Sequence, residues 1–399
     1  MPAFRLACLA YFGAALPSSI LGLLWPSIQV SLRQPVAALG VLVVFGVAAS
    51  AVAGVAAGRL LARWNAGVLL AAGTLLTGVA LAVESVASSV WVFGGAMMLF
   101  GLGFGAVDAA LNAYAAARFG ARQINWIHAA YGLGATAGPA LATLMLGGGM
   151  SWRWVYGSMG AAQALLAVAF ALTVPAWVAP RPEPVERARK PAMVGSLVFT
   201  AVEAGIEAAA GIWGYLFLTE GRGIEARVAG LVVSAYWGMM FLGRVLFGAV
   251  AERLGVRRVL GAAVVGVSAG AALMIVPSAL AAAAGLIVLG LAAAPVFPLF
   301  TLTTADRVGG SADEAVGLQV AASAVGAAAL PAGVGLAIGA STATALAPPL
   351  LALSLAMCVV YRLVSPRRRP GGDSPVSHPD GAPPGEPRRR WARPGRPSS

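Results

Sequence analysis

Residues 248–258 read GAVAERLGVRR, a short charged stretch between two long apolar runs. The flanking runs, 228–250 and 258–276, each reach the length of about 20 residues that a helix needs to cross the hydrocarbon core of a bilayer. Residues 58–63 read GRLLAR and share the first and last positions of residues 248–253 at an offset of 190. The stretch therefore predicts a membrane protein whose two halves repeat one unit.

The composition also predicts a chain surrounded mostly by lipid. Of its 399 residues, 59% are hydrophobic and only 11% are charged, whereas soluble domains carry about 25% charged residues. The 20-residue criterion predicts about twelve transmembrane helices and thus an all-α integral membrane protein. The predicted spans are 6–31, 36–58, 66–84, 90–115, 125–147, 152–175, 193–218, 228–250, 258–276, 279–304, 314–340 and 342–362.

The basic residues of the predicted loops are divided unequally between the two sides of the membrane. With an even number of spans, one side collects fourteen arginines and lysines and the other four. The larger set is Arg5, Arg59, Arg63, Arg118, Arg122, Arg181, Arg187, Arg189, Lys190, Arg253, Arg257, Arg258, Arg307 and Arg362, and the smaller is Arg33, Arg153, Arg222 and Arg227. The positive-inside rule then predicts cytoplasmic termini in a multi-pass protein of the inner (plasma) membrane.

One long polar interruption predicts the domain organisation. Residues 179–192 contain APRPEPVERARKP, which cannot cross lipid, so they form a cytoplasmic linker between six-helix bundles at 1–178 and 193–364. Gly134 and Pro139 recur 192 positions later as Gly326 and Pro331, an offset close to the first one. The two bundles are therefore predicted to be pseudo-symmetric. Residues 365–399, rich in Pro, Arg, Gly and Ser, are predicted to form a disordered basic cytoplasmic tail.

Three carboxylates lie deep in predicted spans, and no other acid is expected at that depth. A charge at a span centre costs about 2.5 to 3.5 kcal/mol, so Asp108, Glu203 and Glu207 should face a cavity or a partner. Glu203 and Glu207 share one helical face, and their repulsion would keep one proton bound near neutral pH. We expect these three acids to couple protons. A protonated carboxyl that only bonds a neighbouring helix is the alternative.

Arg244 is the one cation inside a predicted span. It needs a counter-ion from among the three deep acids unless it extends to the cytoplasmic interface. The other predicted substrate-binding residues are Asn112, Asn125, His128, Trp213 and Trp237. Packing is the alternative for the histidine, and interface anchoring is the alternative for the tryptophans.

Several classes of function are disfavoured by what the sequence lacks. It has no metal-ligand cluster, no nucleophile and base at a catalytic spacing and no phosphate-binding loop, so we expect no enzyme, cofactor or metal. Its cations do not form one basic face for nucleic acid. Cys8 and Cys358 are too few and too distant to imply a disulfide framework. The expected partners are a small-molecule substrate, a proton and the bilayer, with a monomer sufficient for function.

Residues 248–258 resemble the G-x-x-x-[D/E]-R-x-G-x-[R/K]-[R/K] signature of the major facilitator superfamily. The resemblance implies that fold, with a cytoplasmic latch formed by Gly248, Glu252, Arg253, Gly255, Arg257 and Arg258. The first-half counterpart keeps Gly58 and Arg63 but has Ala62 where the family prefers an acid.

Within that superfamily the chain is similar to the fucose permease-like sugar/proton symporters over residues 6–362. The segments that carry the similarity are GLGFG at 101–105 with Asp108 and Asn112, INWIH at 124–128, Glu207 with Trp213 and Tyr215, and PVFP at 295–298. In those permeases an acid four residues before an asparagine serves substrate and proton, which implies this role for Asp108 with Asn112. They also carry an acid on the first helix, where this chain has none.

The sequence thus predicts a secondary active transporter of a small polar, sugar-like solute that works by proton-coupled alternating access. The alternative is a drug/proton antiporter of the same superfamily, because Gly134, Gly138 and Pro139 loosely match the antiporter motif of the fifth span. The fourth span lacks the arginine that such exporters carry before its glycines. A membrane-embedded enzyme and a non-transporting sensor are more remote alternatives.

Overall fold

A computed structural model describes residues 2–177, 192–304, 307 and 312–365. All regular elements within these ranges are helices. The predicted linker, except for Ala192, and the predicted tail after Ser365 lie outside the described residues.

The helices follow the predicted spans closely. The first half contains α1 (Pro2–Ser18), α2 (Leu21–Leu32), α3 (Ala38–Arg63), α4 (Ala66–Val86), α5 (Val90–Arg118), α6 (Ala121–Gly147), α7 (Trp152–Thr173) and the 3-10 helix η1 (Val174–Ala176). The second half contains α8 (Ala192–Thr219), α9 (Ala226–Leu254), α10 (Val256–Ile275), α11 (Ala279–Ala293), α12 (Val296–Leu302), α14 (Ala312–Ala340), the 3-10 helix η2 (Ala343–Leu346) and α15 (Ala347–Val364).

The predicted number of spans agrees with these helices. Within the described residues, eleven helical segments are long and apolar enough to cross a membrane, and α1 with α2 supplies a twelfth if the bent pair counts as one span. The sequence predicted one continuous span over 6–31, but α1 and α2 meet at an angle of 44°. Pro17 lies at the end of α1, where a proline ring disfavours continuation of a straight helix.

Short polar residues fix where several spans begin. The side chains of Asn65, Ser89 and Ser278 accept hydrogen bonds from backbone N–H groups at the starts of α4, α5 and α11, which satisfies donors that a helix start leaves unpaired. Between α9 and α10, Gly255 has a φ of 89°. Only glycine adopts this conformation readily, so Gly255 allows the chain to turn from one span directly into the next.

The two halves repeat one packing scheme. In the first half, α1 packs on α6 and α4 on α5 and α7; in the second, α8 packs on α14 and α10 on α11 and α15. Gly134 of α6 lies directly against the carbonyl oxygen of Phe12, and Gly326 of α14 lies in the same way against that of Ala201. The sequence repeat therefore reflects equivalent close contacts between helices.

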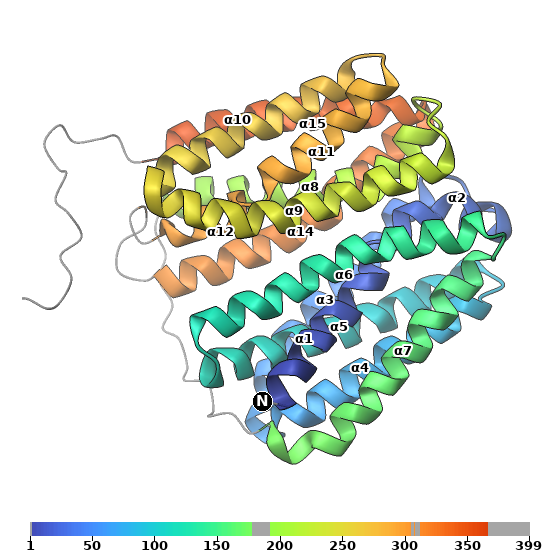
Figure 1. Ribbon diagram of the computed structural model, residues 1–399, viewed down its shortest axis with the longest axis vertical. Coiled ribbons are helices and arrows are strands. Elements are labelled where there is room, and N and C mark those ends of the chain that lie inside the picture. The colour runs from blue at the N-terminus through green and yellow to red at the C-terminus, as the bar shows by residue number, and fades with distance from the viewer. Residues whose placement is uncertain (1, 178–191, 305–306, 308–311, 366–399) are drawn as a thin grey trace, which may run out of the picture. The chain divides into compact units, whose positions relative to one another are not determined.

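The halves meet along three helix pairs: α6 with α9, α3 with α14 and α2 with α8. Along the first pair, Gly230 packs on Thr143, the Ser234 hydroxyl donates to the Thr136 carbonyl oxygen at 2.7 Å, and Gly132 packs on Phe241. Toward the end of α9 the two helices diverge (Figure 1). The halves are thus joined more closely at one end of the bundle than at the other.

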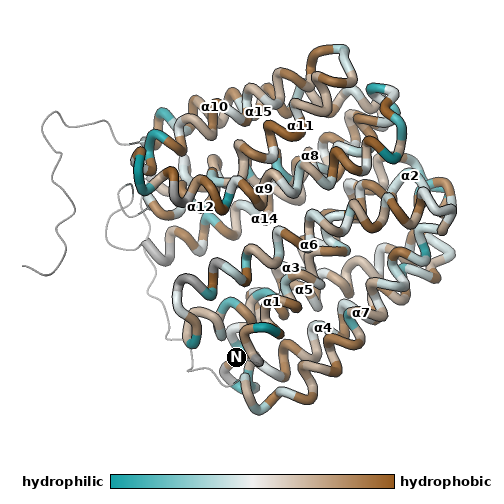
Figure 2. Tube along the Cα trace, in the orientation of Figure 1, coloured by the Kyte–Doolittle hydropathy of each residue, from teal (hydrophilic) through white to brown (hydrophobic). Residues whose placement is uncertain are grey.

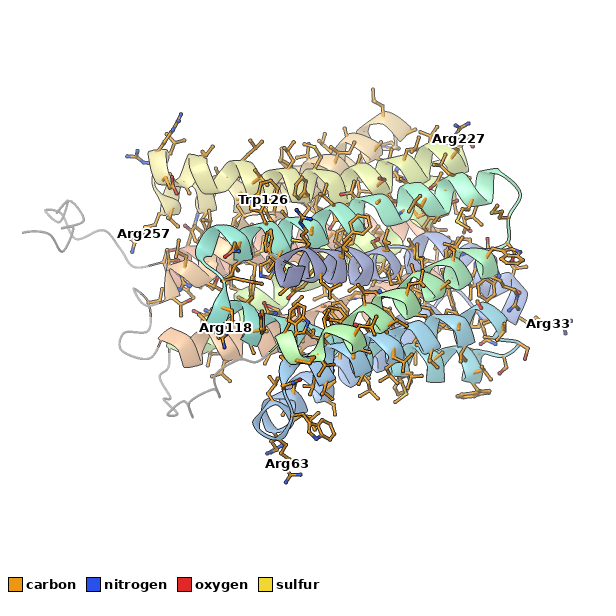
Figure 3. The ribbon with its side chains drawn as sticks, turned by 60° about the horizontal axis from the view of Figure 1, so that its bottom comes forward. Arg33, Arg63, Arg118, Trp126, Arg227 and Arg257 are labelled. Atoms are coloured by element: carbon orange, nitrogen blue, oxygen red, sulfur yellow. The ribbon has the colours of Figure 1, made fainter. Side chains whose placement is uncertain are left out.

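The charged residues mark the two ends of the bundle. Figure 2 shows hydrophobic residues along the helices, with hydrophilic residues concentrated at helix ends and loops. Figure 3 shows Arg33 and Arg227 at one end and Arg118 and Arg257 toward the other. This distribution agrees with the predicted division of the loops into two sets. The closely joined end is the one that carries Arg33 and Arg227.

The close helix contacts predict that a methyl group at Gly326 destabilises the protein. Gly326→Ala would overlap the Ala201 carbonyl, and overpacking of this kind costs about 1 to 3 kcal/mol. Gly333→Ala, on the same helix, has no heavy atom within 4 Å of the added carbon. In thermal unfolding of the detergent-purified protein, Gly326→Ala should unfold at a lower temperature, and Gly333→Ala should not. Equal unfolding temperatures would contradict the assigned contact.

Candidate functional site

Asp108 is held by two hydrogen bonds to one carboxylate oxygen. The Tyr11 hydroxyl, from α1, donates to Oδ1 at 2.8 Å, and Asn112 Nδ2, one turn along α5, donates to the same oxygen at 3.1 Å. Asp108 and Asn112, whose four-residue spacing resembles that of the fucose permeases, are therefore in direct contact. Tyr11 was not predicted. The sequence could have indicated Tyr11, because a tyrosine inside an apolar span needs a partner for its hydroxyl.

Several aromatic and hydroxyl side chains lie next to Asp108. The Tyr11 ring packs against His128 and Tyr131 of α6, with ring centroids 5.3 and 6.0 Å apart. The Tyr131 hydroxyl lies 3.4 Å from the Ser18 hydroxyl of α1. The side chain of His128 is exposed. Helices α1, α5 and α6 thus bring a carboxylate, an imidazole and several hydroxyl groups into one cluster.

In the second half, Arg244 of α9 pairs with Glu207 of α8. The distance from Arg244 Nη2 to Glu207 Oε1 is 3.7 Å, and the side chains are 39% and 22% exposed. Of the three acids expected as counter-ions for Arg244, Glu207 is the one within ion-pair distance. The Tyr236 hydroxyl donates to the main-chain carbonyl of Glu207 at 2.9 Å and so fixes α9 on α8 at this level.

Glu203 has a different environment, although it lies only one turn from Glu207. It is 3% exposed, and its Oε1 atom has no hydrogen-bond partner. Glu207, by contrast, is partly exposed and paired. Of the two glutamates, Glu207 is therefore the more accessible one.

Two residues of α6 lie near both clusters. Tyr131 is within electrostatic range of Asp108 in the first half and of Glu207 and Arg244 in the second. His128 is within the same range of Asp108 and Arg244. The carboxylate cluster and the ion pair consequently lie within electrostatic range of the same α6 residues, where the two halves adjoin.

The two predicted tryptophans occupy different environments. Trp213 is 0% exposed, and its Nε1 atom donates to the Pro331 carbonyl oxygen at 2.8 Å, so it packs α8 onto α14. Trp237 is partly exposed, packs on Gly211, and has no partner for its Nε1 atom. The side chain of Asn125 lies outside the described residues.

The residues of the predicted latch lie where α9 joins α10. Gly255 makes the turn, and four charged side chains around it are exposed: Glu252, Arg253, Arg257 and Arg258. The Tyr361 hydroxyl of α15 donates to the main-chain carbonyl of Arg257 at 3.2 Å. Gly248 lies on α9 within the same motif. The predicted latch residues are thus at the end of the bundle marked by Arg257 (Figure 3).

Glu84 is a further buried acid, which the sequence did not single out. It lies near the end of α4, as the predicted span 66–84 implied, and is only 4% exposed. It lies within electrostatic range of Tyr156 of α7, the helix on which α4 packs. Burial of this residue depends on a neighbouring helix that hydropathy alone does not reveal.

Comparison with known proteins identifies the relatives of this arrangement. The model of one family, the Major Facilitator Superfamily, matches residues 7–218 and 195–393. No curated protein sequence matches the chain.

Three solved structures are similar in fold. A mutant of the nucleoside transporter NupG has a TM-score of 0.77 at 14% identity, covering 91% of this chain and 100% of that one. A bacterial homologue of the human lysosomal transporter Spinster, in an inward-facing and occupied conformation, has a TM-score of 0.70 at 15% identity, covering 91% and 94%. A mutant of the peptide transporter POT has a TM-score of 0.72 at 13% identity, also covering 91% and 94%.

The contrast between the two tryptophans predicts that one substitution destabilises the protein more at Trp213 than at Trp237. Trp213→Phe removes a buried hydrogen bond and should lower the stability by about 1 to 3 kcal/mol. Trp237→Phe removes an N–H group that has no partner, so its effect on stability should be smaller. Thermal unfolding of both purified variants measures the difference. A greater loss of stability for Trp237→Phe would contradict the assigned packing.

Proposed function

The chain belongs to the major facilitator superfamily, and from this premise we propose that it is a secondary active transporter that moves a small polar solute by proton-coupled alternating access. One observation carries the proposal. Asp108, bonded by Tyr11 and Asn112, lies within electrostatic range of the same α6 residues as the Arg244–Glu207 pair of the other half. Titratable groups of both halves thus adjoin where the halves meet.

Asp108 and Glu207 are the proposed proton carriers. Ionisable residues inside membrane spans are costly, and they commonly serve proton relays or substrate paths. Asp108 has its donors in the first half and Glu207 has its counter-ion in the second, so a proton on either group alters contacts within one half. Glu203, one turn from Glu207, is proposed to tune the second carrier through like-charge repulsion.

The contacts between the halves support alternating access. Helices α6 and α9 touch at Thr143 with Gly230 and at Gly132 with Phe241, and they diverge toward the end of α9 (Figure 1). Rocking of one bundle against the other would close the diverging end and open the joined end. His128 and Arg244 follow these contacts along the two helices in the direction of the diverging end. Their side chains are exposed and would face alternate sides of the membrane.

The proposed orientation of the protein in the membrane follows from the basic residues of its loops. Under the positive-inside rule, the end marked by Arg118 and Arg257 is cytoplasmic, with both termini on that side of the inner (plasma) membrane. The diverging end of α6 and α9 would then open to the cytoplasm. The latch residues around Gly255 would lie on the same side and stabilise one of the two arrangements.

The proposed solute is sugar-like. The groups around Asp108 are an amide, an imidazole and hydroxyls, which both donate to and accept from the hydroxyls of a solute. Asn112 and His128 are the proposed binding residues in the first half, with Asn125 three residues before His128 on α6. Trp237, partly exposed on α9, is proposed to contact the apolar face of the solute. The resemblance of Asp108 and Asn112 to the fucose permeases supports the same class.

Transport assays with Asp108→Asn test the proton coupling. In vesicles, a pH gradient of one unit coupled to one proton drives up to about tenfold accumulation, because 1.4 kcal/mol is a factor of ten in concentration. Given a panel of labelled sugars and sugar derivatives, the wild-type protein should accumulate a member of the panel. Asp108→Asn should insert normally but only equilibrate that solute.

Glu84→Gln is the matched control, since it neutralises a buried carboxylate that packs between α4 and α7. It should preserve accumulation. Full accumulation by well-expressed Asp108→Asn protein would remove Asp108 from the mechanism. Expulsion of lipophilic cations, with no sugar moved, would favour the antiporter instead.

A further inference from the structure

Arg244 lies on α9 toward the end at which α6 and α9 diverge. On the way to that end, Gly132 of α6 packs on Phe241 of α9. Arg244 comes three residues after Phe241, and His128 comes four residues before Gly132. In a helix these spacings continue the same face by one turn, so Arg244 and His128 extend the two facing surfaces into the diverging region. Both side chains are exposed.

The guanidinium of Arg244 is bound only loosely. Among the described residues, its contacts within hydrogen-bond or ion-pair range are Glu207 Oε1 at 3.7 Å and Met240 Sδ at 3.7 Å. Strong arginine–carboxylate pairs are bidentate and have N···O distances of about 2.7 to 2.9 Å. A guanidinium presents five N–H donors in a planar fork. With 39% of its side chain exposed, Arg244 has room and donors for a second carboxylate.

Besides the Asp108 carboxylate, which Tyr11 and Asn112 bond, the first-half cluster carries neutral groups that bind hydroxyls. They are the hydroxyls of Tyr131 and Ser18, which lie 3.4 Å apart, and the imidazole of His128. A cation on one half and such groups on the other match a molecule with a carboxylate at one end and hydroxyls along its length. We propose that the solute is a small hydroxylated carboxylate, a sugar acid, and that Arg244 binds its carboxylate.

Charge balance links this assignment to the proton. The Arg244–Glu207 pair is neutral, and a carboxylate added to it would leave one unbalanced negative charge in the membrane interior. A proton from water that binds the Glu207 carboxylate restores neutrality: Arg244 stays cationic, Glu207 becomes a neutral carboxylic acid, and the solute provides the anion. The proton on Glu207 would then accompany each anion, in addition to the proton carried by Asp108. This inference rests on the proposed function, since it names the solute of the same site.

Matched pairs of sugar acids and neutral sugars test the proposal. The pairs are D-glucuronate with D-glucose, D-galacturonate with D-galactose, and D-gluconate with D-glucitol, each differing only in its acid group. Binding to the full-length protein in detergent is measured by equilibrium dialysis of the labelled compounds. At least one acid should bind, with its neutral partner at least about tenfold weaker, because the hydrogen bonds to a charged group are the strong ones.

Two substitutions at Arg244 and one elsewhere complete the test. Arg244→Gln should weaken binding of the acid at least about tenfold, and Arg244→Lys should retain part of it, because lysine keeps the charge but not the fork. Arg227→Gln, at the opposite end of α9, removes an exposed arginine and should leave binding unchanged. Should Arg244→Gln fail to fold, competition of each unlabelled neutral sugar against the labelled acid on the wild-type protein decides.

Three outcomes would overturn the proposal: neutral partners that bind as tightly as the acids, binding that is unchanged in folded Arg244→Gln, or no binding by any acid. A neutral sugar that accumulates in vesicles through Asp108 would overturn it while the proposed function stood. Failure of every compound to accumulate under a pH gradient would count against the proposed function, whatever Arg244 binds.

Discussion

Charged side chains inside a bilayer must find partners within the protein, and this constraint shapes the centre of the molecule. An unpaired ion at a span centre costs about 2.5 to 3.5 kcal/mol. Arg244 meets the constraint through Glu207, and Asp108 does so through Tyr11 and Asn112. Each set of partners comes from one half, and both Asp108 and the Arg244–Glu207 pair are incompletely buried.

The scaffold is duplicated, whereas the charged groups are not. Gly134 and Gly326 make equivalent contacts in the two halves. At the offset of 190, however, Asp108 corresponds to Pro298, Glu207 to Pro17 and Arg244 to Gly54. Each half thus provides the same helix packing but contributes a different chemical group. Similar bundles can rock about a shared interface while the site between them remains asymmetric, with a hydroxyl-rich wall on one side and a cation on the other.

The sequence predicted those features of the fold that depend on the length and composition of its apolar runs. A run of about 20 apolar residues predicts a span wherever it occurs, so the helices and the deep positions of Asp108, Glu207 and Arg244 were available. Which side of a helix a residue faces depends on its neighbours, and the pattern around Trp213 and Trp237 did not distinguish a buried packing residue from a partly exposed one. Tyr11 and Glu84 were overlooked for the same reason, because their partners come from other helices.

The central claim is that the two halves exchange between arrangements joined at opposite ends. It can be measured as distances between spin labels in a protein whose Cys8 and Cys358 are replaced by alanine. One label pair, at Gln123 of α6 and Glu252 of α9, spans the diverging end, and a second, at Met150 and Arg227, spans the joined end. Lowering the pH with the transported solute present should shift the two distances in opposite directions. If each label pair kept one distance that neither pH nor solute changed, alternating access would be contradicted.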